Sequence, residues 1–314
     1  MLVMPEEMDF SRKHFSAIIY GAPGVGKTTL ALSAPKPLLI DFDGGVSRVK
    51  AYHRCLTLVC QNYDEVLRDI KDDAVKDCET IVVDTGGSFI AYLQEWAMRQ
   101  NPAANRQKNG AISLKGFGAV KQEFQHFSSL IRDTMQKNVI FVFHSEEAKD
   151  KDGNPMQRLL CEGAAKNIVW QPCDFGGYLQ MIGSDRVLSL SPTQEFFAKG
   201  CYGLSGNIPV PSIGDTDKND FLTRLFDKAR ENIKAEADVY APIREKYENA
   251  MIAANGIVSA VESAEDATNA INALIGLDHA LTSKKEASAM LNDRAKALGF
   301  IYDPEKKAYA EKRV

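Results

Sequence analysis

The sequence has 314 residues, 45% of them hydrophobic and 25% charged, so it can bury a full α/β core and still carry a second module. Its net charge of −4 excludes a protein whose whole surface attracts nucleic acid or an anionic membrane. Six cysteines without a C-x-x-C pair indicate reduced thiols rather than a zinc knuckle or a disulfide framework. Because no apolar run has the length of a membrane span and the start lacks a signal-peptide core, we expect a cytoplasmic protein without membrane association.

Short apolar runs alternate with segments of helical spacing in the first half of the chain. We expect strands at residues 15–20, 37–40, 56–59, 81–83 and 139–143, and a helix near 63–70. This alternation predicts an α/β fold with a mostly parallel, helix-covered central sheet. We expect three further strands, at residues 175–182, 186–190 and 195–202, to extend the sheet antiparallel at one edge.

The last third of the chain changes character. Residues 203–220 are rich in glycine, proline and small polar residues, which predicts a loop, and strand signals disappear from Phe221 onward. Helical spacing covers residues 221–254 and 264–298, with a break expected at Asn255-Gly256. We therefore expect an ATPase core at residues 1–210, in which 12–30 supply a strand, a phosphate loop and a helix start. A linker at 211–220 and a helical C-terminal module at 221–314 follow.

A phosphate-binding loop follows the first strand. The G-x-x-x-x-G-K-T spacing, between an apolar strand and an amphipathic helix, predicts a loop whose backbone N–H groups surround phosphates. Lys27 is expected to contact the β- and γ-phosphates, and the Thr28 hydroxyl to hold Mg²⁺. A chance match in a glycine-rich turn would not explain the strand before it and the helix after it. The expected ATP-binding residues are Gly21, Ala22, Pro23, Gly24, Val25, Gly26, Lys27, Thr28 and Thr29.

Polar side chains end three other expected strands. Asp84 follows a buried run and is the candidate for the second Mg²⁺ ligand, with a turn or helix cap as the alternative. Asp41 and Asp43 lie on the same side of their strand, and one of them could orient the attacking water or merely cap the next element. His144 follows the strand at 139–143, where it could sense the γ-phosphate or be structural.

The order of these features resembles the RecA-like ATPase core and, within it, the phage ATP-binding proteins of the RecA-like single-strand annealing group, over residues 12–210. The resemblance assigns the general base to Asp43 in the run Ile40-Asp41-Phe42-Asp43, where RecA has Glu, and the Walker-B acid to Asp84. His144 stands where RecA has an Asn-Gln pair. The family implies ATP, Mg²⁺ and a homo-oligomeric ring or filament, in the host cytoplasm if the protein is phage-encoded.

In RecA, two loops hold DNA, and the matching segments here are residues 102–115 and 145–166. The charged candidates in them are Arg106, Lys108, Lys115, Lys149, Lys151, Arg158 and Lys166. Both segments are rich in glycine, asparagine and charge, as mobile phosphate-contacting loops are. Ordinary solvated loops are the alternative, which the acids at residues 146, 147, 150 and 152 favour.

Two further assignments come from the resemblance. Lys199 matches one of two RecA lysines that reach the neighbouring subunit's γ-phosphate, with a solvated strand lysine as the alternative. The C-terminal helices, closed by a glycine and an aromatic anchor near residues 295–303, are expected to pack on themselves or to dock a single-strand DNA-binding protein.

Three functions fit the phosphate loop. The first is an ATP-dependent recombination or annealing protein acting on single-stranded DNA. The second is a phage nucleotide-switched ATPase that acts on a protein partner without direct DNA binding. The third, a small-molecule kinase, should show an arginine-rich lid, and the stretch after Asp84 is poor in arginine.

Overall fold

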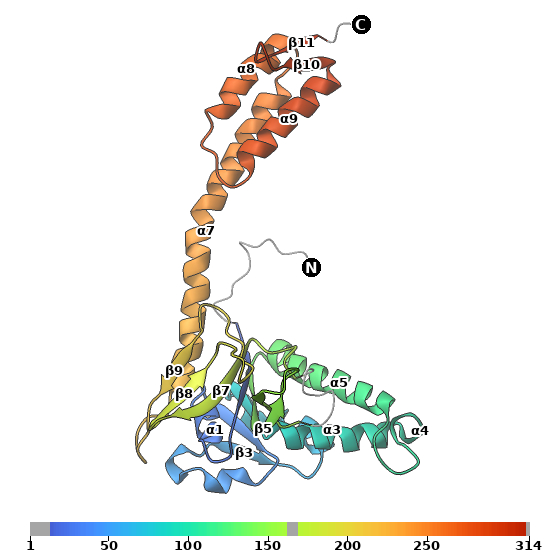
Figure 1. Cartoon of the computed structure of the whole chain (residues 1–314), viewed down its shortest axis with the longest axis vertical. Coiled ribbons are helices and arrows are strands. Elements are labelled where there is room, and N and C mark those ends of the chain that lie inside the picture. The colour runs from blue at the N-terminus through green and yellow to red at the C-terminus, as the bar shows by residue number, and fades with distance from the viewer. Residues whose placement is uncertain (1–12, 162–168, 312–314) are drawn as a thin grey trace. The chain divides into compact units, whose positions relative to one another are not determined.

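The computed structural model describes residues 13–161 and 169–311, and the chain divides into two compact units whose boundary falls between Asn232 and Ile233. The first unit contains the central sheet, and the second contains helices and a small hairpin (Figure 1). No helix within the described ranges combines the length and apolar character that crossing a bilayer requires.

Nine strands among the described residues form the sheet of the first unit, in the order β3-β2-β4-β5-β1-β7-β8-β9, with β6 paired to β5. Neighbours from β3 to β7 pair in parallel, whereas β8 and β9 are antiparallel. The expected α/β fold with a mostly parallel central sheet is therefore confirmed. The strands are β1 Ser16–Gly21, β2 Pro37–Asp41, β3 Leu56–Val59, β4 Thr80–Asp84, β5 Asn138–Lys149, β6 Pro155–Leu159, β7 Phe175–Ile182, β8 Asp185–Ser189 and β9 Asn207–Val210.

The strand register brings the expected site residues together at the carboxyl ends of the strands. Gly21 pairs with His144 across β1 and β5, and Asp41 pairs with Asp84 across β2 and β4. Gly21, Asp41 and Asp84 end their strands, and His144 is the last residue of β5 that pairs in parallel with β1; open α/β sheets bind ligands at this end of the strands.

Helices flank this sheet and bury its apolar residues. One face forms a core in which Tyr63, Phe89, Phe124, Phe127 and Phe141 are completely buried. Asn62, Thr85 and Ser113 accept backbone N–H groups at the starts of α2, α3 and α5, because a capping side chain satisfies donors that the first turn leaves free. The helices of this unit are α1 Lys27–Ala31, α2 Tyr63–Asp69, α3 Gly86–Gln100, α4 Pro102–Asn105 and α5 Leu114–Ser129.

The antiparallel edge differs from the prediction in three ways. β7 pairs in parallel with β1, so antiparallel pairing begins one strand later than expected. Residues 195–202 form no strand, and only Phe196 and Lys199 make isolated bridges. The next strand is β9, within residues expected to be a loop. The positive φ angles of Tyr202 (54°) and Gly203 (73°) turn the chain there and end any extended run.

Helix α7 (Phe221–Ser259) crosses the unit boundary in sequence. Its first part, which we expected to begin the C-terminal module, packs in the first unit, where the Leu222 N–H donates to Ser33 Oγ at 2.9 Å and Phe226 stacks on Phe175. The helix also continues through Asn255 and Gly256, so the expected break is wrong. Burial of Ala254 and Val258 in the second unit offsets the roughly 1 kcal/mol that a helical glycine costs.

The second unit consists of the end of α7, α8 (Ala264–Ile275), α9 (Ser283–Ala297) and the hairpin β10 (Phe300–Asp303) with β11 (Ala308–Glu311). Gly299, with a φ of 85°, follows α9, as the stop signal predicted. The hairpin contradicts our expectation that no strand follows Phe221. It forms because Phe300 and Tyr309 are buried against the helices, a tertiary contact that the local pattern does not reveal.

Candidate ATP-binding site

The phosphate loop joins β1 to α1 at the carboxyl edge of the sheet. Gly24 and Gly26 have φ angles of 78° and 94°, in the left-handed region that side chains other than glycine rarely adopt. Gly26 is the residue before helix α1, which begins at Lys27. The local sequence therefore turns the chain back so that the backbone N–H groups of the loop and the first helical turn face the same space.

Lys27 is buried, with 5% of its surface exposed. Its Nζ donates to the Ala22 carbonyl at 2.8 Å and lies 3.3 Å from His144 Nδ1. Burial lowers the pKa of Lys27 to about 8, although the carboxylate of Asp84 opposes the shift. Among the described residues no carboxylate pairs directly with this cation, so an anionic phosphate would compensate a charge that these residues leave costly.

Thr28 and Asp84 converge on the position expected for Mg²⁺. The Thr28 hydroxyl donates to Asp84 Oδ2 at 2.5 Å, and burial raises the pKa of the Asp84 carboxyl. Two protein oxygens, with phosphate and water completing the shell, suit Mg²⁺, which binds few protein ligands and keeps several waters. Bound there, the ion would neutralise charge on the phosphates.

Asp41 and Asp43, which the sequence left as alternatives, have different surroundings. Asp41 is buried, and its carboxylate accepts the backbone N–H groups of Asp43, Gly45 and Val46 at 3.2, 2.8 and 2.9 Å. It organises the loop after β2 and has little capacity left for a water molecule. Asp43 is exposed and accepts a hydrogen bond from the Thr85 hydroxyl at 3.0 Å. The geometry thus favours Asp43 as the general base.

His144 is half-buried beside Lys27. Burial, and then the charge of Lys27, lower the pKa of His144, so the ring is neutral at pH 7. Since the lysine is the donor at Nδ1, the proton of the neutral ring lies on Nε2. That N–H is a donor available to a phosphate or to the attacking water.

These residues line one cleft with an empty volume of about 830 Å³. It contains the expected Lys27, Thr28, Asp43, Asp84 and His144, but neither Asp41 nor Lys199. It also contains Arg48 and Thr85, to which we assigned no role from the sequence. The signals for them were a cation five residues after Asp43 and a hydroxyl directly after Asp84. The lining residues are Gly24, Gly26, Lys27, Thr28, Thr29, Asp43, Gly45, Arg48, Val49, Asp84, Thr85 and His144.

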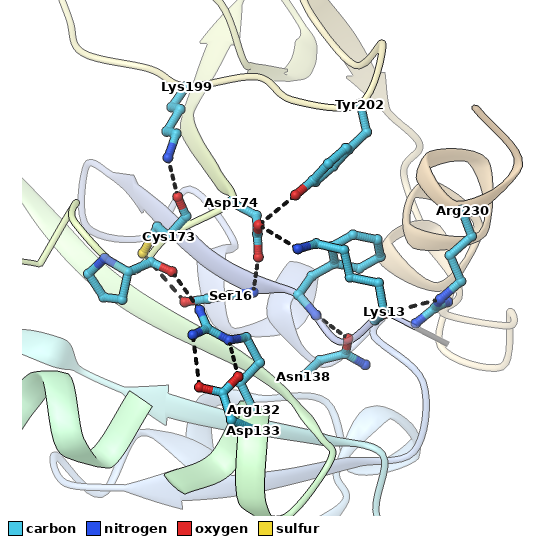
Figure 2. A network of polar contacts seen from close by, with 12 residues as sticks. Lys13, Ser16, Arg132, Asp133, Asn138, Cys173, Asp174, Lys199, Tyr202 and Arg230 are labelled. Carbon is cyan, nitrogen blue, oxygen red and sulfur yellow. Dashed lines mark hydrogen bonds and ion pairs between the residues drawn. The ribbon is translucent and has the colours of Figure 1, made fainter. Parts of the chain in front are cut away.

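Lys199 lies near the amino ends of the parallel strands, away from the cleft, and its Nζ donates to the Cys173 carbonyl (Figure 2). Its bridge to Gly176, near the start of β7, places it three residues along the strand from Leu179, which pairs with Gly21. The structure therefore does not bring Lys199 to the cleft of its own chain.

A network of polar contacts centred on Asp174 also lies at the amino ends of the strands (Figure 2). This carboxylate accepts the Ser16 N–H at 3.0 Å and the Tyr202 hydroxyl at 2.9 Å, and lies 3.4 Å from Lys13 Nζ. Nearby, Arg132 pairs with Asp133 at 2.8 Å. These contacts fasten the start of β1 to the segments before and after β7, which makes the network structural.

The residues expected to contact DNA fall in two places. Arg106, Lys108 and Lys115 are exposed between α4 and the first turn of α5. Lys149 and Lys151 are exposed on the hairpin of β5 and β6. Arg158 is half-buried, with its guanidinium 3.6 Å from the centre of the Phe197 ring. Lys166 lies outside the described residues.

Comparison with known proteins identifies the domain. The family described as AAA domain (AAA_24) matches residues 13–202, which is more than half of the chain. This chain belongs to that AAA domain family. Residues 13–202 are therefore an ATPase domain, and the phosphate-loop cleft is its candidate nucleotide site.

Two other comparisons add little. The crystal structure of the flagellar accessory protein FlaH from Methanocaldococcus jannaschii matches at 11% identity with a TM-score of 0.34, over 62% of this chain and 84% of that chain. The similarity is too low to carry an argument about this domain. No curated protein matches the sequence.

Proposed function

We propose that the chain is a Mg²⁺-dependent ATPase of the RecA-like phage recombination and single-strand annealing group, and that it acts on single-stranded DNA. The chemical part rests on the cleft, in which Lys27 faces the phosphate position and Thr28 and Asp84 fit the metal. Asp43 orients the water that attacks the γ-phosphate. His144 and Arg48 supply hydrogen-bond donors to the charge that develops there.

The observation that supports DNA coupling is the continuity of β5. This strand carries His144 at the cleft and extends to Lys149, five residues further, before the hairpin turns into β6. A contact made by the hairpin could thus shift the position of a donor at the γ-phosphate through an unbroken strand. Hydrolysis would then respond to DNA without a separate moving domain.

A nucleotide-switched ATPase that acts on a protein partner is the second candidate. Acids accompany the lysines of the hairpin, and Asp150 holds its turn by accepting the N–H groups of Asp152 and Asn154. The second unit has a groove of about 500 Å³ lined partly by Ile271, Leu274 and Tyr302, which a protein partner could occupy.

In the first proposal, the second unit would dock a single-strand DNA-binding protein, and the ATPase would assemble as a homo-oligomer.

Fluorescence anisotropy with a labelled oligonucleotide separates the two candidates. The double variant Lys149→Gln/Lys151→Gln should weaken binding and reduce the salt slope by about 1.4, because each lost single-strand phosphate contact removes about 0.7. Lys71→Gln/Lys76→Gln, which changes two exposed lysines on another part of the unit, is the matched control. Equal binding by both variants and the wild type would favour the protein-partner function.

A further inference from the structure

The turn between β2 and β3, residues 42–55, carries Arg48 to the cleft. It contains two short 3₁₀ helices, η2 (Gly45–Arg48) and η3 (Ala51–His53), and Arg48 ends the first of them. The guanidinium of Arg48 lies over Gly45, where a Cβ would meet Arg48 Nη2 at 2.9 Å. Since 3₁₀ helices have poorer hydrogen-bond geometry than α-helices, the position of Arg48 depends on the other contacts that fix this turn.

Arg48 brings a positive charge to the side of the cleft where the γ-phosphate would lie. Among the described residues, Lys27 and Arg48 are the two cations that line the cleft. Burial, and then the charges of Lys27 and Arg48, lower the pKa of His144, so the charge of Arg48 reaches the space in front of that ring. An arginine at this place stabilises the charge of a phosphoryl-transfer transition state, and it does so best when it is held in position before the reaction.

Arg54 fixes the backbone on both sides of Arg48. Its Nε donates to the Val49 carbonyl at 2.9 Å, and its Nη2 donates to the Ser47 carbonyl at 3.0 Å. Because the planar guanidinium presents these donors in a rigid fork, one side chain holds the two carbonyls in a fixed relation. Ser47 and Val49 are the chain neighbours of Arg48, so this fork sets where the backbone of Arg48 lies. Arg54 itself is not among the residues that line the cleft.

Other contacts hold the two ends of the turn. At its start, the Asp41 carboxylate accepts backbone N–H groups of η2. At its far end, the buried His53 ring donates from Nε2 to the Gly214 carbonyl at 3.0 Å. With both ends fastened, the middle of the turn is the part whose position the Arg54 fork decides, and Arg48 lies in that part.

We propose that Arg54 is a positioning residue for ATP hydrolysis, which holds Arg48 at the γ-phosphate by fixing the carbonyls of Ser47 and Val49. The inference rests on the proposed ATPase function and adds the contact that its arginine depends on. Arg54 acts on turnover only through Arg48. Because both arginines belong to one chain, this part of the site is complete without a residue from a neighbouring subunit.

A double-mutant cycle in the full chain tests this assignment, with single-turnover hydrolysis of ATP in the presence of Mg²⁺ as the measurement. Arg48→Ala should lower the rate by on the order of 10³-fold. Arg54→Ala should lower it by roughly 10–100-fold, because a small misplacement of Arg48 is enough to weaken its contact with the phosphate. In the Arg48→Ala background, Arg54→Ala should cause no further loss, which a merely structural role of Arg54 would not produce.

The matched control is Arg68 on α2, whose Nε and Nη2 both donate to the Asp69 carboxylate. Arg68→Ala removes a fork of the same geometry from another exposed part of the unit, and it should hydrolyse ATP at the wild-type rate in both backgrounds.

Three results would overturn the inference. Wild-type turnover by Arg54→Ala would show that the fork does not set the position of Arg48, and wild-type turnover by Arg48→Ala would remove that arginine from the reaction. Losses that multiply in the double variant would show that Arg54 acts independently of Arg48. Each result leaves the ATPase function intact as long as the wild-type protein hydrolyses ATP and Lys27→Ala does not. Absence of turnover in the wild-type protein would instead contradict the proposed function itself.

Discussion

Charged side chains lie at both ends of the parallel strands, half-buried at the amino end and buried at the carboxyl end, and they are compensated differently. At the amino end of the strands, Asp174 has three partners within the protein. Burial alone would lower the pKa of Lys13, but its contacts with Tyr202 and Asp174 raise it. At the carboxyl edge, burial lowers the pKa of Lys27 and raises that of Asp84. The first edge is complete and stabilises the fold, whereas the second requires a ligand.

The largest effect that this comparison predicts is on catalysis. Lys27→Ala should lower ATP turnover by on the order of 10²–10³-fold and weaken nucleotide binding, because it removes the only lysine that lines the cleft within the described residues. Steady-state hydrolysis and calorimetric titration measure the two effects. Lys76→Ala, an exposed lysine paired with Asp73, should behave like the wild type. Comparable losses in both variants would contradict a specific role of Lys27 in the cleft.

Asp43→Asn should separate binding from chemistry. We expect ATP affinity near that of the wild type and a turnover lower by roughly 10²–10⁴-fold, since the amide cannot accept the proton of the attacking water. Asp41→Asn is the informative partner variant, because it should cost about 1–3 kcal/mol of stability through the three N–H groups that it holds. Near-normal turnover by Asp43→Asn would assign the base elsewhere, with Asp41 the next candidate.

A substitution in the Asp174 network should lower stability and leave catalysis unchanged. Asp174→Ala leaves Lys13 and the Ser16 N–H without their acceptor, so we expect the unfolding free energy of the first unit to fall by about 2–4 kcal/mol. Urea denaturation measures this loss. The fraction that remains folded should keep its turnover per active site. A large change in KM or kcat at unchanged stability would mean that this network belongs to the ATP site.

The smallest effect concerns the stability cost of Lys27. Its pKa is about 8 in the folded protein and near 10.5 when unfolded, so the unfolded chain binds more protons between these values and stability rises with pH there. Lys27→Met should therefore be more stable than the ligand-free wild type at pH 7, by about 1–3 kcal/mol, with the gap closing above pH 8. Thermal unfolding from pH 6 to 10 measures it. A less stable variant at pH 7 would contradict a ligand-dependent carboxyl edge.

Sequence reasoning predicted most of the parallel sheet, because its buried strands are continuous apolar runs and three of these runs are followed by Asp41, Asp84 and His144. It failed where tertiary contacts decide the structure. The hairpin at Phe300 and Tyr309 forms through burial against helices, and α7 passes Gly256 because its neighbours are packed. β9 was not predicted, because it lies in a glycine- and proline-rich stretch whose composition is typical of a loop.

For the site, the phosphate loop and the clustering of Asp43, Asp84 and His144 followed from strand ends, which parallel pairing brings to one edge. The separate roles of Asp41 and Asp43 depended on which carboxylate the backbone N–H groups occupy, and spacing does not reveal this. Arg48 was missed because it reaches the cleft from the turn after β2, which no motif marks. The DNA-contacting residues stay a prediction.

The most direct test of the proposed function is the ATP hydrolysis rate of the full chain with Mg²⁺, measured with and without single-stranded DNA at low salt and again at higher salt. The account predicts turnover that rises with DNA and a stimulation that declines as salt displaces the phosphate contacts. Turnover that is the same with and without DNA at low salt would contradict it.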